Sequence, residues 1–362
     1  MRILISGYYG FGNVGDEAIL AALVAHLHAQ HPAAQVCVLS AQPEVTAREL
    51  GVEAAQRWSW GAILREVRRA DLVIQGGGGL LQDTTSAVSP LYYLAILHFC
   101  RRGFRKRPYA IFAQGLGPLQ RPFLRRLARR ALSRAASITL RDDASAAFLR
   151  DELRVPYEPL VAPDPALCLQ PAPLEAAEDA LCAAGLGSDA PRIGIVLREW
   201  PGVTQVEAAV SEFIARAAEE WGARCLLIPF QREADMAQCV RLSAGSRASV
   251  WDKPSSPAEL VALTARLDMV VAMRLHAQIF AVSQAVPMVG ISYDPKVAAF
   301  CKQAGQPCLQ FAEVTAEGLW HWASEAFDPH CLRTEMLATV AEGLAGEAEG
   351  HFRALDAQIA RL

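Results

Sequence analysis

The chain has 362 residues, of which 52% are hydrophobic and 20% are charged, and its formal net charge is -3. This composition is typical of a globular α/β protein and excludes a disordered or fibrous chain. A charge so close to neutral gives no global attraction to nucleic acid, so we expect no nucleic-acid partner. We also expect no secretory signal and no membrane span, because no apolar run approaches roughly 18 residues. The nine cysteines lack paired spacing, which predicts reduced thiols in a cytoplasmic protein and no zinc site.

Short apolar runs alternate with helical patterns in both halves of the chain. In the first half, strands are expected within 2–8, 34–41, 71–78, 109–117 and 137–143, with helices within 16–31 and 121–136. After residue 172 the same order returns, with strands within 192–200, 225–230, 268–276 and 287–294. Strands that are buried on both faces and alternate with helices predict parallel sheets. The predicted fold class is therefore α/β, with two Rossmann-like domains facing each other across a cleft.

The domain boundary is expected near Gln170, in a segment rich in Pro, Ala and Gly. This predicts an N-terminal Rossmann-like domain over 1–170 and a C-terminal one over 171–328. The remaining segment, 329–362, has a helical pattern almost to its end. We expect it to pack back on the N-terminal domain.

The turn after the first expected strand, 10–15, matches the glycine pattern of dinucleotide-binding domains. Two features argue against NAD. Asp16 and Glu17 open the following helix, where they would repel a pyrophosphate, and the second strand has no acidic residue at its end. The alternative is a tight turn between strand and helix, in which the two carboxylates interact favourably with the helix dipole, and it explains part of this glycine and acid pattern. Asn13, Asp16 and Glu17 also suit the hydroxyl groups of a sugar.

Four consecutive glycines, 76–79, follow another expected strand. Glycine is unfavourable in a strand interior and at a helix start, but it permits a close approach between the backbone and a ligand. We therefore expect Gly77 and Gly78 in a binding site for the acceptor, with Asp83 as a further candidate. A purely structural glycine turn is the alternative.

Cations follow three of the expected strands, at the ends where parallel α/β sheets bind ligands. Arg141 ends one strand, with a salt bridge to one of the two following aspartates as the alternative. Arg274 and His276 end another, where extended geometry would direct both to the same side, and Lys296 follows the next strand. Two fixed cations beside a histidine suit a small anion with two or three charges, and acid chemistry on that anion.

The segment Arg101–Arg134 contains ten arginines and Lys106 but no acidic residue. Its second half has the spacing of a helix with one basic face. A solvated helix face would normally carry both signs of charge. The single sign therefore favours an anionic partner, either lipid headgroups or a polyprenyl pyrophosphate.

Five motifs, in this order, resemble those of the bacterial polysaccharide pyruvyltransferases of the CsaB type, which act in cell-wall polysaccharide biosynthesis. They are SGYYGFGNVGDEAIL, QGGGGLLQD, LRD, MRLHAQIFA and SYDPKV. The resemblance implies two GT-B-like domains, with the acceptor on the N-terminal side and phosphoenolpyruvate on the C-terminal side. It implies transfer of pyruvate from phosphoenolpyruvate onto two hydroxyls of an N-acetylmannosamine unit in a lipid-linked precursor, which serves the anchoring of S-layer proteins.

By this resemblance, Arg141, Arg274 and Lys296 bind the donor, and His276 acts in catalysis together with Arg141 and Lys296. His276 is the expected acid, and no cofactor or metal is expected. We expect a cytoplasmic protein at the inner membrane face, of unassigned oligomeric state. Two alternatives stay open: a GT-B glycosyltransferase that uses a nucleotide sugar, and a non-catalytic glycan- or lipid-binding protein.

Overall fold

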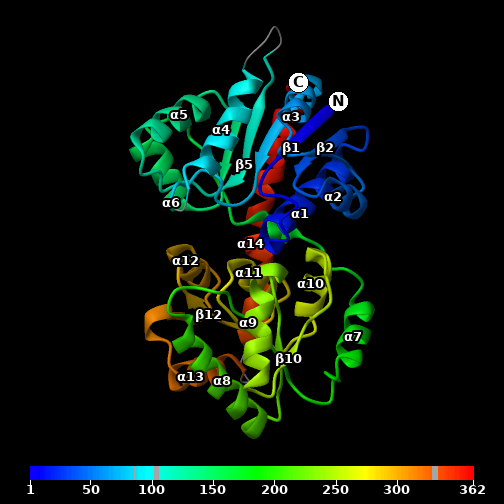
Figure 1. Cartoon of the computed structure of the whole chain (residues 1–362), viewed down its shortest axis with the longest axis vertical. Helices are drawn as coiled ribbons and strands as arrows, with labels where there is room; N and C mark the ends of the chain where they lie inside the picture. Colours follow the sequence, from blue (N-terminus) through cyan, green and yellow to red (C-terminus); the bar gives the residue numbers. More distant parts are fainter. Residues whose placement is uncertain (85, 102–105, 328–332) are drawn as a thin grey trace. The chain divides into compact units, whose positions relative to one another are not determined.

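A seven-stranded sheet and a six-stranded sheet, both parallel, form the cores of two units of the chain (Figure 1). The computed structural model describes every residue except 85, 102–105 and 328–332. The first unit comprises Met1–Cys168 and Ala345–Leu362, and the second comprises Leu169–Leu344. The chain passes from the first unit to the second between Cys168 and Leu169, close to the boundary predicted near Gln170. The first four residues of the predicted segment 329–362 lie outside the described residues.

The sheet of the first unit has the strand order β3-β2-β1-β4-β5-β6-β7. Its central strands are buried along almost their whole length, because apolar side chains fill both faces. The strands are β1 (Arg2–Ser6), β2 (Gln35–Ser40), β3 (Glu53–Gln56), β4 (Leu72–Gly76), β5 (Tyr109–Gln114), β6 (Ser137–Leu140) and β7 (Leu160–Val161).

Helices connect the end of each strand to the start of the next, so they begin at the edge of the sheet where the strands end. We call this the carboxyl edge, and the opposite one the amino edge. The helices of the first unit are α1 (Val14–Gln30), α2 (Pro43–Leu50), α3 (Trp60–Arg69), α4 (Val88–Cys100), α5 (Pro122–Leu132) and α6 (Asp143–Ala147). A π-helical turn (Phe148–Glu152) and a 3-10 turn (Pro165–Cys168) complete the unit.

The long terminal helix α14 (Arg333–Ile359) enters the first unit at Ala345. The Phe352 ring lies 5.4 Å from the ring of Phe112 in β5, so the end of α14 packs on the sheet of this unit.

The sheet of the second unit has the order β10-β9-β8-β11-β12-β13. Its strands are β8 (Arg192–Val196), β9 (Arg224–Leu227), β10 (Ser249–Val250), β11 (Met269–Ala272), β12 (Met288–Ser292) and β13 (Cys308–Gln310). Its helices are α7 (Leu174–Ala183), α8 (Val203–Glu220), α9 (Arg232–Ala244), α10 (Pro257–Thr264), α11 (Leu275–Ser283), α12 (Pro295–Gln303) and α13 (Ala316–Phe327), with a 3-10 turn at Phe311–Glu313. The predicted α/β class with two Rossmann-like parallel sheets is confirmed. In the described part of the chain, no helix combines the length and apolarity that crossing a bilayer requires.

Candidate active site

The two sheets share one strand order, and in each sheet the direction of the connections reverses at one point. In the first unit, β1 lies between β2 and β4, and in the second unit β8 lies between β9 and β11. The chain therefore leaves in opposite directions from β1 and β4, and from β8 and β11. Crevices at such reversals, outside the carboxyl ends of the strands, are where open α/β sheets bind ligands.

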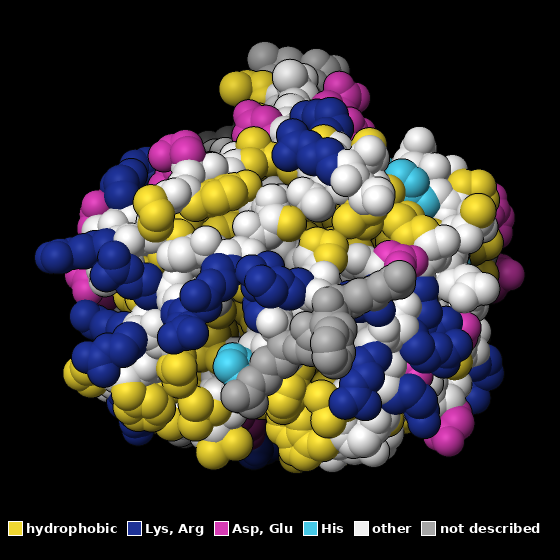
Figure 2. Space-filling view, turned by 90° about the horizontal axis from the view of Figure 1, so that it is seen from above, with side chains coloured by type: hydrophobic (Ala, Val, Ile, Leu, Met, Phe, Trp, Pro, Cys, Tyr) yellow, Lys and Arg dark blue, Asp and Glu magenta, His cyan; other side chains and the backbone are white. Residues whose placement is uncertain are grey.

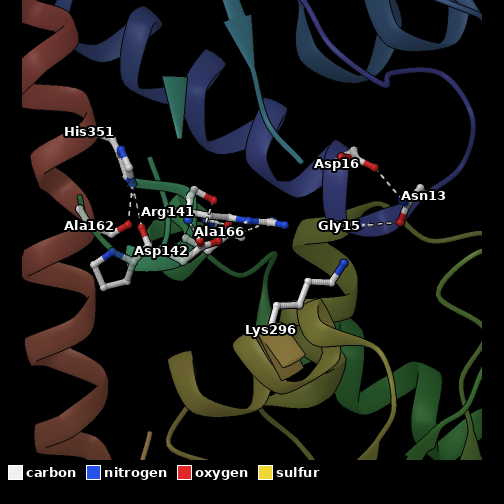
Figure 3. A network of polar contacts seen from close by, with 12 residues as sticks. Asn13, Gly15, Asp16, Arg141, Asp142, Ala162, Ala166, Lys296 and His351 are labelled. Carbon is white, nitrogen blue, oxygen red and sulfur yellow. Dashed lines mark hydrogen bonds and ion pairs between the residues drawn. The ribbon is translucent and has the colours of Figure 1, made fainter. Parts of the chain in front are cut away.

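In the first unit, Asn13, Asp16 and Gly78 meet at the reversal between β1 and β4. Asn13 caps α1 by accepting a hydrogen bond from the Gly15 N–H at 3.3 Å, and its Nδ2 donates to Asp16 Oδ2 at 2.6 Å (Figure 3). A Cβ atom at Gly78 would lie 2.2 Å from Asp16 Oδ1, and Gly77 and Gly78 have φ values of +79° and +63°. The glycine run therefore admits a carboxylate of the chain itself, and it places that carboxylate at the carboxyl edge.

Glu17 lies beside this group and is largely buried. Its Oε1 accepts a hydrogen bond from the Gly10 N–H at 2.7 Å. The pKa of Glu17 is raised to about 7, mainly by burial and in smaller part by the Asp16 carboxylate, while the hydrogen bond from the Gly10 N–H acts in the opposite direction. A carboxyl that titrates near neutral pH is suited to proton transfer.

Asp83 lies in a different environment from the other predicted acceptor residues. Its side chain is 0% exposed. It accepts hydrogen bonds from the backbone N–H groups of Gln120 and Arg121 at 2.6 and 3.0 Å, and from Arg121 Nη1 at 3.1 Å. Burial alone would raise the pKa of Asp83, but these hydrogen bonds lower it overall. Asp83 therefore links its own loop to the loop of Gln120 and Arg121, and we do not include it among the proposed acceptor residues.

Arg141 follows β6 and has a partner that the sequence did not single out. Its Nη1 donates to Asp164 Oδ2 at 3.2 Å, whereas its Nε lies 3.8 Å from Asp142 Oδ2 (Figure 3). A Cβ atom at Gly115 would lie 3.1 Å from the guanidinium, so this glycine leaves room for the arginine. The salt bridge to Asp142, weighed as the alternative, is therefore present only as this 3.8 Å contact, and the closer partner of Arg141 is Asp164.

The loop that carries Asp164 is held by α14. His351 is fully buried, and its Nε2 lies 3.0 and 2.9 Å from the carbonyl oxygens of Ala162 and Pro163. Asp164 Oδ1 in turn accepts from the Ala166 N–H at 3.1 Å. The terminal helix thereby fixes the carboxylate that positions Arg141.

In the second unit, Arg274 and His276 are not on an extended strand, and the geometry predicted for them is wrong. β11 ends at Ala272, Arg274 is the N-cap of α11, and His276 lies in the first turn of that helix. Arg274 Nη2 donates to Asp235 Oδ1 on α9, and the Asp235 side chain is 1% exposed. The charge of Arg274 is thus neutralised by a buried partner that the sequence did not indicate.

Lys296 lies in the first turn of α12, after β12. Asp294 caps this helix by accepting from the Lys296 N–H at 3.1 Å. The Lys296 ammonium lies 3.3 Å from Asp294 Oδ2, and the side chain is 39% exposed. This cation is within reach of a ligand from solvent.

Arg198, which follows β8, is a functional candidate that was not predicted from the sequence. Its Nη1 donates to the Tyr293 hydroxyl at 2.8 Å, and its guanidinium carbon lies 5.2 Å from the Trp200 ring and 4.9 Å from the Tyr293 ring. No carboxylate pairs with Arg198 among the described residues. The signal in the sequence that could have identified Arg198 was its position just after a strand. Because β8, β11 and β12 are neighbours in the sheet, their carboxyl ends bring together Arg198, Arg274, His276 and Lys296.

The basic segment Arg101–Arg134 divides between the two edges of the first unit, and its Arg102 and Arg105 lie outside the described residues. Arg121 and Arg125, at the start of α5, pair with Asp83 and Glu152 at 3.1 and 2.9 Å. The end of α5 lies at the amino edge, where the hydroxyl of Tyr109, the first residue of β5, donates to the Ala131 carbonyl at 2.6 Å.

Four arginines of this helix and the turn after it are exposed and have no ion pair within the described ranges: Arg126, Arg129, Arg130 and Arg134. Figure 2 shows Lys and Arg side chains gathered on one face of the molecule.

One group of potential metal ligands occurs among the residues that the structure describes. The Nε2 atoms of His26 and His31 lie 2.9 and 2.8 Å from the same Asp356 oxygen, between the end of α1 and α14. These hydrogen bonds account for the cluster, which lies at the end of α1 away from Asn13.

The sequence model described as Polysaccharide pyruvyl transferase matches residues 13–295 of the chain. No curated protein sequence matches it. MnaA of S. aureus, solved with UDP, is similar in fold, with a TM-score of 0.67 at 11% identity over 98% of this chain and 95% of that one. Anabaena Alr3699/HepE, solved with UDP and glucose, has a TM-score of 0.62 at 14% identity over 100% of this chain and 98% of that one. The UDP-GlcNAc 2-epimerase of Neisseria meningitidis, bound to UDP-GlcNAc, has a TM-score of 0.60 at 13% identity over 98% of this chain and 99% of that one. At such identities these structures show a shared fold, that of GT-B glycosyltransferases and epimerases.

Proposed function

The chain belongs to the polysaccharide pyruvyl transferase family, and on this premise we propose that it takes pyruvate from phosphoenolpyruvate. It is a pyruvyltransferase, and the proposed acceptor is an N-acetylmannosamine unit of a lipid-linked cell-wall precursor. Two hydroxyls of that sugar receive the pyruvate as a ketal, and phosphate is released. The product would serve the anchoring of S-layer proteins.

The observation that supports this donor most is the set of cations at the carboxyl edge of the second unit. Phosphoenolpyruvate carries a carboxylate and a phosphate, which need two separate cationic contacts. Lys296 and Arg198 supply charge that is not bound to a buried acid. Arg274, oriented by Asp235, adds N–H donors in a fixed direction. We keep Arg141 as a donor contact on the strength of the family resemblance.

The proposed chemistry begins with proton transfer from His276 to the methylene carbon of phosphoenolpyruvate. Positive charge then develops at the central carbon, and the oxygen of one sugar hydroxyl bonds to it while its proton passes to a base. The oxygen of the second hydroxyl then bonds to the same carbon as the bond from that carbon to the phosphate oxygen breaks, and its proton leaves with the phosphate. Glu17 is our choice for the base, because it follows Asp16 in the first turn of α1, at the proposed acceptor site, and because burial raises its pKa. We propose no cofactor or metal, because arginine and lysine can stabilise the charges.

The acceptor is assigned to the carboxyl edge of the first unit, at Asn13, Asp16 and Glu17 with the backbone of Gly77 and Gly78. The amide and the carboxylates match the hydrogen-bonding capacity of sugar hydroxyls.

The arginines at the end of α5 are proposed to meet anionic lipid headgroups at the inner membrane face, in the cytoplasm. They lie at the amino edge, opposite the proposed acceptor residues. This position favours the lipid headgroup over the acceptor pyrophosphate as their partner.

The function is tested by incubating the purified protein with phosphoenolpyruvate and a soluble disaccharide ending in N-acetylmannosamine. We expect phosphate release in equal amount to a pyruvyl ketal seen by mass spectrometry. Transfer of a sugar from a UDP-sugar would instead identify a glycosyltransferase. Glycan binding with neither reaction would identify a non-catalytic binding protein.

The role of His276 is tested by His276→Gln, with His321→Gln on the exposed face of α13 as the matched control. The first variant should bind phosphoenolpyruvate by calorimetry yet lose turnover by about 10²–10⁴-fold, the usual contribution of general acid catalysis. The control should keep the parental rate. Near-parental turnover of His276→Gln would move the acid role to Lys296.

A further inference from the structure

Arg57 is a buried cation at the carboxyl edge of the first unit, directly after β3. The residue is 3% exposed. Its Nη1 donates to the Gly7 carbonyl at 2.7 Å and its Nη2 to the Tyr93 hydroxyl at 3.1 Å. No carboxylate forms an ion pair with it among the residues that the structure describes. A buried charge normally requires a countercharge, so another source of attraction must hold it.

Aromatic rings supply this attraction. The guanidinium carbon lies between 4.8 and 5.9 Å from five ring centroids, those of Tyr8, Phe11, Trp58, Tyr92 and Tyr93. The face of an aromatic ring carries negative charge density and attracts a cation within about 6 Å. The cation and the rings therefore fix one another in place.

Trp58 is the member of this cluster that meets solvent. It is 60% exposed, although its ring centroid lies 5.0 Å from the Arg57 guanidinium carbon. The Phe11 and Tyr92 rings flank it at 6.3 and 5.7 Å. An indole held in this way loses little conformational freedom when a ligand binds. The structure thus presents a rigid flat apolar surface to solvent.

This surface lies at the same edge as the acceptor residues. Tyr8 and Phe11 follow β1, as Asn13 and Asp16 do. Burial and the Asp16 carboxylate raise the pKa of Tyr8, whereas Arg57 lowers it. Tyr8 therefore lies within electrostatic reach of both the proposed hydroxyl-binding acid and the cation beneath Trp58.

We propose that Trp58 stacks on a sugar ring of the acceptor, with Arg57 as the positioning residue. One face of many pyranose rings presents C–H groups with partial positive charge, which complement the negative face of an indole. Asn13 and Asp16 would bind the hydroxyls of the same glycan and set its register, as a few polar groups do in apolar sites. A lipid chain would use the apolar surface but not these polar groups. The inference rests on the proposed function and adds a recognition surface to it.

The test compares Trp58→Phe, which keeps a flat face, with Trp58→Leu, which keeps only apolarity. Trp58→Leu should raise KM for the disaccharide ending in N-acetylmannosamine by about tenfold, a typical value for the loss of an aromatic contact. Its kcat and its KM for phosphoenolpyruvate should stay at the parental values. Trp58→Phe should retain most of the affinity. Trp60→Leu is the matched control, at a 43% exposed indole that packs on Tyr92 and Phe99 but is not among the described rings that contact the Arg57 guanidinium. It should change KM less than about twofold.

Calorimetry with the disaccharide alone separates this proposal from the proposed function. Glycan affinity that depends on Trp58, without ketal formation, would support the stacking surface and contradict the pyruvyl transfer. Equal glycan affinity of the parent and Trp58→Leu would overturn the stacking surface even if ketal forms. It would also be overturned if Trp58→Leu lost binding to neutral phosphatidylcholine vesicles but kept the glycan, because Trp58 would then contact lipid.

Discussion

Buried arginines in this molecule are stabilised in two physically different ways. Arg141 and Arg274 each bind an aspartate that is at most 5% exposed, Asp164 and Asp235. Removing one partner of such a pair costs about 3–5 kcal/mol, because it leaves an unpaired buried charge. Arg57 relies on ring faces instead. The first two arginines are held in fixed directions at strand ends, which suits them to orient an anion.

Glu17 provides a prediction in which pH decides stability. Its pKa is raised from 4.5 to about 7, mainly by burial, so between these values the folded chain binds more protons than the unfolded one. The free energy of unfolding should therefore fall as pH rises from about 5 to 8, by about 2 kcal/mol from this group. Glu17→Gln keeps an oxygen for the Gly10 N–H and should remove that fall. Urea unfolding at both pH values measures the difference.

The exposed Glu44→Gln is the matched control for this measurement, and it should keep the parental pH dependence. If Glu17→Gln shows the same decline as the parent, Glu17 does not carry a raised pKa.

At the residue scale, strand ends were predictable and tertiary partners were not. The pattern of apolar runs placed Arg274 and Lys296 just after two strands, and in the structure they follow β11 and β12. This pattern could not locate Asp235, which is 39 residues from Arg274 along the chain, because pairing across elements leaves no local pattern. The glycine run was recognised as a close approach, yet the chain's own Asp16 occupies part of it.

At the scale of elements, the central strands were predictable and the edge strands were not. The strands absent from the prediction are β3, β7, β10 and β13, each at an edge of its sheet. β7 and β10 have two residues each, and β3 reads EAAQ with half of its positions exposed. A central strand is buried on both faces and gives a continuous apolar run, whereas an edge strand does not need one.

The terminal helix offers a prediction at this scale, because Asp356 joins α14 to His26 and His31. Asp356→Ala removes the acceptor of both histidines and should lower the melting temperature at pH 7, corresponding to roughly 1–2 kcal/mol at a partly exposed site. Burial would raise the pKa of Asp356, but the two histidines lower it overall. The stabilisation is therefore present above the unfolded pKa and is lost as pH falls through the lower folded value.

Differential scanning calorimetry at pH 7 and pH 3 measures this change. Glu349→Ala is the control, because its partner Arg353 and Glu349 itself are each 64% exposed and such pairs contribute little. Equal effects of the two substitutions at pH 7 would show that Asp356 does not anchor the helix.

At the scale of the whole molecule, both units repeat one strand order but carry different side chains at its reversal. The reversal in the first unit carries an amide and carboxylates, and the reversal in the second carries arginines, a lysine and a histidine. Opposite chemistry at equivalent positions fits an acceptor with hydroxyls and a donor with negative charge. Both folds could be predicted from the sequence because strand and helix patterns alternate regularly in each half of the chain. The similarity to UDP-binding structures supports the fold and does not identify a ligand of this chain.

The amino edge of the first unit gives the last prediction, that the protein binds anionic membranes through α5. Arg126, Arg129 and Arg130 are exposed, and Phe123 and Leu127 on the same helix are 46% and 43% exposed. Each cation near an anionic surface contributes about 1 kcal/mol, which salt screens. The double substitution Arg129→Glu and Arg130→Glu should therefore weaken sedimentation with phosphatidylglycerol vesicles by at least about tenfold at low salt. Arg150→Glu, at an exposed arginine already paired with Asp151, should have a much smaller effect. Equal binding to phosphatidylcholine vesicles, or binding that salt does not change, would show that α5 has another role.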